Sequence, residues 1–229
     1  GRNALDANLT GASNTAVGRD SLGANTSASF NSAFGFNALK ANTTGANNTA
    51  VGEGAMEVNI GGSCNTAMGV SALDANTTGA DNVALGTYSL STNTTAGKNT
   101  AVGRSSLSAN ITGAQNVAVG YTSLEANTTG SNNVAVGYQA LDANTTVSEG
   151  TAVGYRALSS NTTGANNTAL GTTAMLDNTT GQQNVAVGSN AMANNTTAND
   201  NTSVGAYSMN SNTTGTNNIA VGRNALRLN

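Results

Sequence analysis

The side chains that most often carry out chemistry in proteins are rare in this chain. Its 229 residues include no His, one Cys (Cys64), 8 Lys and Arg together, and 11 Asp and Glu together. A nucleophilic triad or Cys–His pair needs a His base, and zinc, haem and iron–sulfur sites need Cys or His ligands. We therefore expect no catalytic residues, no metal site and no cofactor, and a single Cys excludes a disulfide within the chain.

Carboxylates are the next candidates, because a pair can act as acid and base. Several recur at one position of a sequence repeat that is described below: Asp6, Glu57, Asp74, Glu125 and Asp142. No two of them stand out as an acid–base pair, and the Gly-Gly-x-Gly-x-Asp calcium loop is absent. We expect a solvated acidic face that keeps the protein soluble.

The commonest polar pattern is Asn-Thr-Thr, which matches the N-glycosylation signal. A structural role for the Asn explains it better, because Asn59 and Asn229 keep the Asn without the signal. The second Thr forms a column of its own, and regular Thr ranks on a flat face can order water as ice-binding proteins do. Adjacent Thr on a strand point to opposite sides, so only one column would face outward unless the pair lies on a turn. The candidate contact residues in this column are Thr44, Thr78, Thr129 and Thr163.

Three tyrosines, Tyr121, Tyr138 and Tyr155, share another position of the repeat in consecutive copies. In stacked repeats they would form a short exposed aromatic ladder, which could contact a protein or a carbohydrate. Cross-repeat stacking for stability explains the same spacing. Cys64 lies at a variable position of the repeat, and we expect it to be exposed.

All of these residues belong to one repeat, and its period determines the fold. Glycines recur with a constant 17-residue period from Gly1 to Gly222 without insertion or deletion, which gives thirteen repeats and the beginning of a fourteenth. Numbered from this glycine, the consensus is Gly-x-x-Ala/Ser-Leu/Met-x-x-Asn-Thr-Thr-Gly-x-x-Asn-Thr/Val-Ala-Val. A helical repeat needs about 33 residues or more, and Asn, Thr and Gly are weak helix formers. The period predicts an all-β parallel β-solenoid in which each repeat is one coil, with coils about 4.8 Å apart.

Position 8 is Asn in every copy, and position 14 is Asn in all copies except Gly150. Identical residues lie above one another in a solenoid, so their amides can form hydrogen-bonded ladders. We place both columns at inward-facing corners, where Asn and the Gly of position 11 would tolerate left-handed turn geometry. The predicted ladder at position 8 comprises Asn8, Asn25, Asn42, Asn59, Asn76, Asn93, Asn110, Asn127, Asn144, Asn161, Asn178, Asn195 and Asn212.

Two short apolar segments remain in each coil, and we expect both to be strands. One is Thr/Val-Ala-Val, as in Val117–Val119, and the other is Ala/Ser-Leu/Met, as in Ala140 and Leu141. Adjacent apolar residues indicate burial on both faces of a strand. One residue of each pair would then fill the coil and the other would form an exposed stripe about 60 Å long. Such a stripe predicts association, most simply as a trimer around a long axis, whereas a monomer would need both residues inside at a bend.

The motif Asn-x-Ala-Val-Gly-x-x-Ala/Ser-Leu, as in 116–124 and 133–141, resembles the YadA-like head repeat of trimeric autotransporter adhesins. The resemblance covers every repeat, and similar repeats occur in phage tail fibres and other bacterial fibres. It implies a left-handed parallel β-roll, three chains in a head, and a ligand on a host, matrix or cell surface. The period is longer than the family's usual repeat, with the extra residues around Asn-Thr-Thr-Gly.

We therefore expect residues 1–229 to form a single solenoid domain, a fragment of a longer chain, that serves as the rigid head or shaft of an extracellular adhesive fibre. A phage tail fibre or structural filament and an ice-binding solenoid are the alternatives. A net charge of −3 provides no basic surface for nucleic acid, and no apolar run is long enough for a membrane helix. The expected location is extracellular, at a cell surface or on a virion.

Overall fold

The computed structural model describes residues 1–228, and within this range the chain forms strands and turns but no helix. Each repeat contributes one strand of three residues, at positions 15–17 of the repeat. The strands are β1 (Thr15–Val17), β2 (Ser32–Phe34), β3 (Thr49–Val51), β4 (Thr66–Met68), β5 (Val83–Leu85), β6 (Thr100–Val102), β7 (Val117–Val119), β8 (Val134–Val136), β9 (Thr151–Val153), β10 (Thr168–Leu170), β11 (Val185–Val187), β12 (Thr202–Val204) and β13 (Ile219–Val221). The chain divides into two compact units: the first, Gly1–Gln115, contains β1 to β6, and the second, from Asn116 onward, contains β7 to β13.

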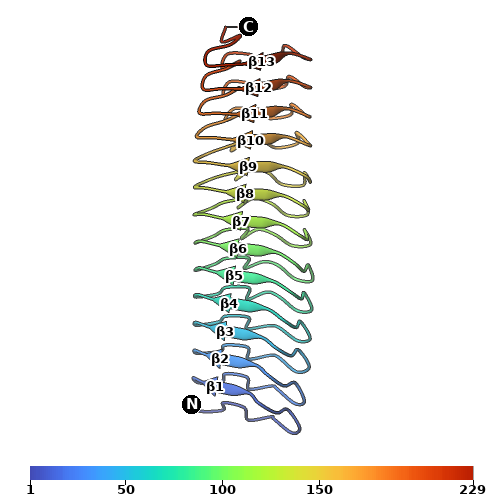
Figure 1. The fold of residues 1–229 in the computed structure, drawn as a ribbon. Helices are drawn as coiled ribbons and strands as arrows, with labels where there is room; N and C mark the ends of the chain where they lie inside the picture. Colours follow the sequence, from blue (N-terminus) through green and yellow to red (C-terminus); the bar gives the residue numbers. More distant parts are fainter. Residues whose placement is uncertain (229) are drawn as a thin grey trace. The chain divides into compact units, whose positions relative to one another are not determined.

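Within each unit, consecutive strands pair in parallel and in register. Ala16 of β1 lies opposite Ala33 of β2, and Val134 of β8 lies opposite Thr151 of β9. Each strand residue is therefore paired with the residue at the same position of the next repeat. Figure 1 shows the resulting succession of coils within each unit, with strands in chain order. The prediction of a parallel β-solenoid with 17-residue coils is confirmed.

The interior of each coil is filled from two segments. On the strand, the Ala of position 16 points inward and is completely buried from Ala33 to Ala186, while positions 15 and 17 point outward. From the opposite wall, the Leu or Met of position 5 is completely buried from Leu22 to Met209. A small residue therefore faces a large one across a thin core, which is how close packing is reached without voids.

The prediction of a second strand at Ala/Ser-Leu/Met is wrong. These residues lie in turns, and both members of the pair are inside the coil: Ala140 and Leu141 are completely buried. Leu141 has a φ of 52°, in the left-handed region, so the chain reverses there and places consecutive side chains on the same side. The pair thus adopts the alternative arrangement, inside at a bend, and the outer face of the strands is left as the exposed apolar stripe.

The left-handed residues lie at positions 3, 5 and 13, not at the two Asn columns or at position 11 as predicted. Asp20, Leu22 and Phe30 of one coil have φ values of 58°, 48° and 64°. Left-handed geometry costs a bulky residue roughly 1–2 kcal/mol, so packing must hold the Leu column in place. Position 1 needs Gly for a further reason. Gly52 has a φ of 134°, and a Cβ there would lie 2.5 Å from the carbonyl oxygen of Gly69 in the next coil.

Candidate functional site

The most regular polar feature is the column of buried Asn side chains at position 8. In the first unit each amide Nδ2 donates to Oδ1 of the Asn one coil earlier, as from Asn59 to Asn42 at 2.8 Å and from Asn76 to Asn59 at 2.8 Å. The same Nδ2 also donates to a carbonyl within its own coil, as from Asn59 to Gly62 at 3.0 Å. From Asn25 to Asn212 this column is at most 1 % exposed. The folded chain therefore does not present these Asn side chains for glycosylation; Asn229 lies outside the described residues.

The ladder is interrupted twice in the second unit. The Oδ1 atoms of Asn144 and Asn195 are buried without a hydrogen-bond donor, although Asn178 still donates to Asn161 at 2.8 Å. In both of these coils position 11 carries a Cβ, at Val147 and Ala198.

Position 11 lies directly against the ladder. At Gly62, an added Cβ would lie 2.5 Å from Asn59 Oδ1 and 2.7 Å from Asn76 Nδ2, the two atoms of one ladder step. The glycine therefore serves close approach rather than left-handed geometry. Ala28 and Ala96 show that a methyl group can be tolerated, because the following steps persist at 3.2 and 2.9 Å.

The Asn of position 14 forms a different column, which joins side chain to backbone. Asn48 Oδ1 accepts from the backbone N–H of Asn65 at 2.9 Å, and Asn48 Nδ2 donates to the carbonyl of Gly62 at 2.8 Å. Each such Asn thus ties its coil to the next at two points. Gly150 offers no side-chain oxygen to the coil that follows it.

The Thr pair lies at a bend, so neither of its residues is in a strand. The first hydroxyl is used internally: Thr77 Oγ1 donates to the carbonyl of Thr94 at 3.0 Å, and Thr128 Oγ1 to that of Thr145 at 3.0 Å. The second Thr is exposed at every candidate position: Thr44, Thr78, Thr129 and Thr163. The result is one column of free hydroxyls, whereas a flat ice-binding face would need two such columns side by side.

Tyr121, Tyr138 and Tyr155 stack with ring centroids 5.5 and 5.4 Å apart and interplanar angles of 8° and 11°. The three residues are 43 %, 44 % and 51 % exposed. Because stacked rings face one another, Tyr138 presents its edge rather than its face to a ligand. This arrangement suits stabilisation between coils and edge contacts better than stacking of a sugar on Tyr138.

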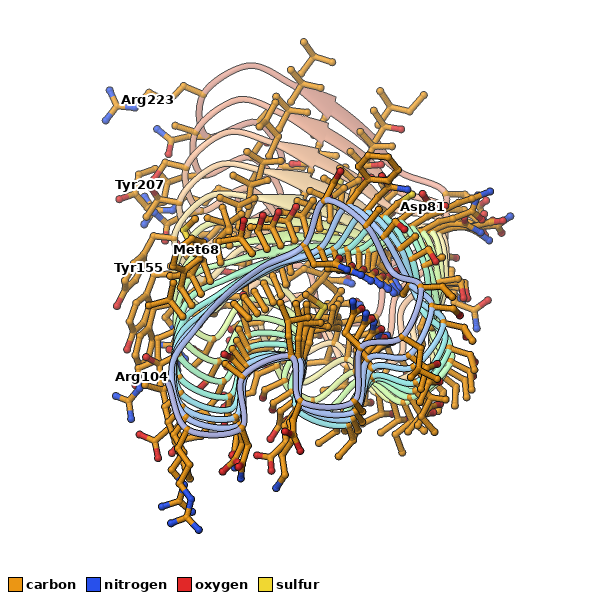
Figure 2. The ribbon with its side chains drawn as sticks, turned by 90° about the horizontal axis from the view of Figure 1, so that it is seen from below. Met68, Asp81, Arg104, Tyr155, Tyr207 and Arg223 are labelled. Carbon is orange, nitrogen blue, oxygen red and sulfur yellow. The ribbon has the colours of Figure 1, made fainter. Side chains whose placement is uncertain are left out.

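The outer face of the strands carries an extended apolar surface. Exposed side chains include Phe34 and Met68 in the first unit and Leu170, Val185 and Val221 in the second. In Figure 2, Met68 and Asp81 lie at opposite ends of the strand face. The column of apolar side chains at position 17, to which Met68 belongs, is therefore separated from the polar turn that precedes each strand.

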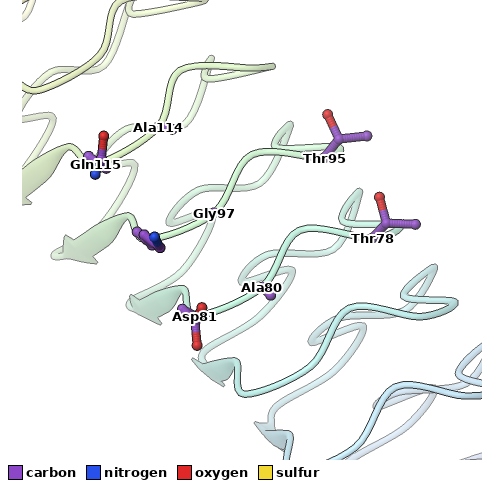
Figure 3. A pocket seen from close by; sticks show the side chains of 8 residues that line it. Thr78, Ala80, Asp81, Thr95, Gly97, Ala114 and Gln115 are labelled. Carbon is purple, nitrogen blue, oxygen red and sulfur yellow. The ribbon is translucent and has the colours of Figure 1, made fainter.

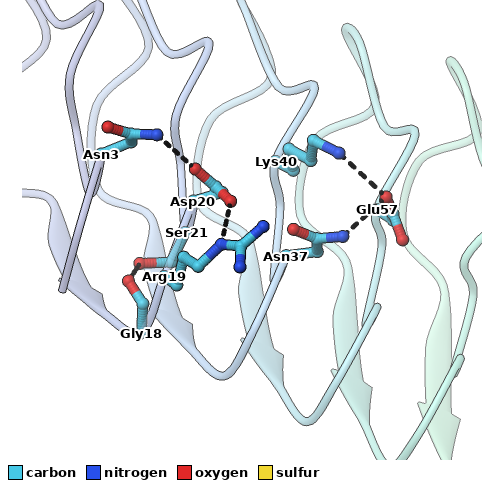
Figure 4. Close-up of polar contacts among 8 residues, drawn as sticks. All are labelled: Asn3, Gly18, Arg19, Asp20, Ser21, Asn37, Lys40 and Glu57. Carbon is cyan, nitrogen blue, oxygen red and sulfur yellow. Dashed lines mark hydrogen bonds and ion pairs between the residues drawn. The ribbon is translucent and has the colours of Figure 1, made fainter.

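Charged side chains partly compensate one another on the first unit (Figure 4). Lys40 Nζ lies 3.3 Å from Glu57 Oε1, which also accepts from Asn37 Nδ2 at 3.0 Å. Asp20 accepts from Asn3 at 2.8 Å and from Arg19 at 2.9 Å, and these two hydrogen bonds lower the pKa of its carboxyl.

The residues of the acidic column at position 6 differ in burial. Burial raises the pKa of Asp74, with a further contribution from the charge of Glu57. Burial and the charge of Glu125 likewise raise the pKa of Asp142, although Arg156 opposes the shift. The column is thus only partly solvated: Asp6 is exposed, whereas the other four carboxylates are half-buried.

A groove of about 440 Å³ runs along the first unit between the outer Thr column and the turn before each strand. Figure 3 shows Thr78 and Thr95 on one side, Asp81 and Gln115 on the other, and Gly97 between them. Cys64 is exposed, as expected.

The structure and the comparisons with known proteins assign no further site. Residues 1–228 contain no group of three or more His, Cys, Asp or Glu side chains placed to hold a metal ion. No helix in this part of the chain is long and apolar enough to cross a membrane. Compared with known proteins, the chain matches no family model, no curated protein and no solved structure.

Proposed function

We propose that this chain is a rigid segment of an extracellular fibre, built from several copies of the chain packed through the outer face of their strands. The observation that carries the proposal is the outward apolar column of position 17. Its side chains, such as Val136 and Met68, have no partner inside their own coil because the Ala of position 16 fills that side. Each unit carries its own stretch of this column, and an extended exposed apolar face typically marks an interface.

Closed symmetry would cover the same column on each copy, and three copies around one axis is the simplest arrangement for a fibre. The resemblance to YadA-like head repeats supports the same assembly. A cell-surface adhesin is our first choice and a phage tail fibre or filament the second, since all three use a rigid repeating segment.

The adhesive role follows from repetition. Stacked coils stabilise their neighbours and keep surface columns in register, so weak contacts to a host, matrix or cell-surface ligand would add through avidity. Ice binding is the weaker alternative, because in most Thr pairs the first hydroxyl is bonded to a backbone carbonyl of the next coil, as at Thr77 and Thr128. A measurement of thermal hysteresis tests it directly.

The decisive experiment is the absolute mass of the purified chain in solution by light scattering. We expect a mass of three chains, against 22.5 kDa for one. Val136→Lys places a charge in the apolar column and should lower the mass, whereas the matched Thr129→Lys on the exposed Thr column should not. A stable monomer of the unaltered chain would overturn the proposed assembly.

A further inference from the structure

The groove of the first unit results from side chains that are missing at position 12. In other coils a Ser at this position accepts a hydrogen bond from the backbone N–H of position 12 one coil earlier. Ser29 Oγ accepts from Ala12, and Ser63 Oγ accepts from Ala46, both at 3.0 Å. The three consecutive coils that form the groove carry Ala80, Gly97 and Ala114 instead.

Without these hydroxyls, two residues that line the groove have backbone N–H groups with no acceptor in the part of the chain that the structure describes. Neither the N–H of Ala80 nor that of Gly97 has an acceptor among the described residues. The carbonyl oxygens of the same residues are used, because Lys98 N–H donates to Ala80 at 3.0 Å and Gln115 N–H donates to Gly97 at 3.3 Å. The floor therefore offers two N–H donors one coil apart, which is about 4.8 Å.

The walls add charged side chains and hydroxyl groups. Asp81 and Lys98 are exposed on consecutive coils, and neither belongs to an ion pair within residues 1–228. Thr78 and Thr95 line the opposite side of the groove (Figure 3). A carboxylate, an ammonium group, backbone N–H groups and hydroxyls thus line one groove, together with the methyl groups of Ala80 and Ala114.

This mixture matches a saccharide better than a simple anion. A sugar hydroxyl both donates and accepts, so it can donate to the Asp81 carboxylate while a neighbouring oxygen accepts from Lys98 or a backbone N–H. An isolated anion would meet the charge of Asp81. The groove volume also falls within the usual range of about 300–1,000 Å³ for small-ligand sites.

We propose that this groove binds a neutral saccharide through the N–H groups of Ala80 and Gly97 and the side chains of Asp81 and Lys98. The saccharide would be the ligand of the proposed adhesive fibre, so its role in adhesion rests on that proposed function. Binding itself does not depend on assembly, because every named group belongs to one chain.

The test is an NMR titration of the full chain with methyl α-mannopyranoside, methyl β-galactopyranoside and N-acetylglucosamine, with sodium sulfate as a separate arm. We expect at least one sugar to shift the amide signals of Ala80 and Gly97 with a dissociation constant of about 1 mM. Ala114→Ser supplies the missing hydroxyl to Gly97 and should weaken binding at least about tenfold. Ala46→Ser is the matched control, because it adds the same hydroxyl in the same unit outside the groove, and it should leave binding unchanged.

Equal weakening by Ala114→Ser and Ala46→Ser would overturn the site. So would the absence of shifts with all three sugars, or shifts with sulfate alone. Light scattering on the same samples separates the two proposals: a trimer without sugar-induced shifts contradicts the groove only, and a monomer with them contradicts the assembly only.

Discussion

The two units share one repeat but differ in the completeness of their internal hydrogen bonding. From Asn8 to Asn110 the first unit forms every step of the position-8 ladder, with Nδ2–Oδ1 distances of 2.7–3.2 Å. In the second unit two steps are missing, and the position-14 column loses a member at Gly150. The comparison shows that the repeat tolerates the loss of individual buried amide contacts when the strands and the Leu or Met core persist.

The largest effect is expected in the first unit from Gly62→Val, which introduces the residue that the second unit carries at the same position, Val147. This change should disrupt the ladder in the first unit. The added side chain would collide with Asn59 Oδ1 and with the next coil, so we expect a loss of about 3–5 kcal/mol of local stability. Hydrogen exchange of the coils around Gly62 measures it. An unchanged exchange pattern would show that position 11 does not control the ladder.

Removing an equivalent amide from each unit should give unequal losses. Asn59→Ala removes a side chain that accepts from Asn76 and donates to Asn42 and Gly62, and we expect a cost of about 3 kcal/mol. Asn144→Ala removes one whose Oδ1 already lacks a donor, so the cost should be smaller by about 1 kcal/mol. Local hydrogen exchange in both variants compares them, and equal losses would remove the distinction between the units.

Gly150→Asn should make the hydrogen bonding of the second unit more like that of the first. A Cβ at Gly150 would lie 3.2 Å from Asn133 Oδ1 and 3.4 Å from the nearest atom of Leu141, so a small adjustment admits it. The new amide can accept from the backbone N–H of Asn167, and we expect a gain of about 1 kcal/mol. Slower exchange in residues 151–167 is the readout; faster exchange would mean that the site cannot accept the side chain.

The smallest effect concerns pH. The pKa values of Asp74 and Asp142 are raised on folding, so the folded state binds more protons and each carboxylate destabilises the fold above its folded pKa. Asp74→Asn should therefore stabilise the first unit near pH 7, by less than about 1 kcal/mol, and have no effect near pH 3. Asp142→Asn should gain less, because Arg156 partly offsets the shift. Thermal unfolding at both pH values checks this, and a gain that is larger at acid pH would contradict the sign.

Much of the fold could be predicted because the period fixes which residues lie above one another. The 17-residue spacing was sufficient for the parallel coil, the buried Asn columns and the stacking of Tyr121, Tyr138 and Tyr155. It could not show the path of the chain within one coil. The left-handed Leu141 has no local signature, since Leu is not a residue expected at positive φ, and an Ala-Leu pair is equally compatible with a strand.

The roles of the glycines and of the groove were also inaccessible from sequence. Gly62 looks like a turn residue, yet its function is to leave room for two amide groups of neighbouring coils. The groove depends on Ala80, Gly97 and Ala114 occurring in consecutive coils at a position that otherwise varies. The absence of Ser in that column was a visible signal, but its meaning depends on the N–H groups it leaves open.

The position-8 ladder has a direction. Within each unit, its amide steps run from the Nδ2 of the later coil to the Oδ1 of the earlier one, so a finished coil displays an unfilled acceptor toward the C-terminal side. In the first unit, where every step is formed, a chain that emerges N-terminus first therefore meets a template at each step, and coils can be added in the order of synthesis. Aligned amides also polarise one another, so each added coil strengthens the ones already formed.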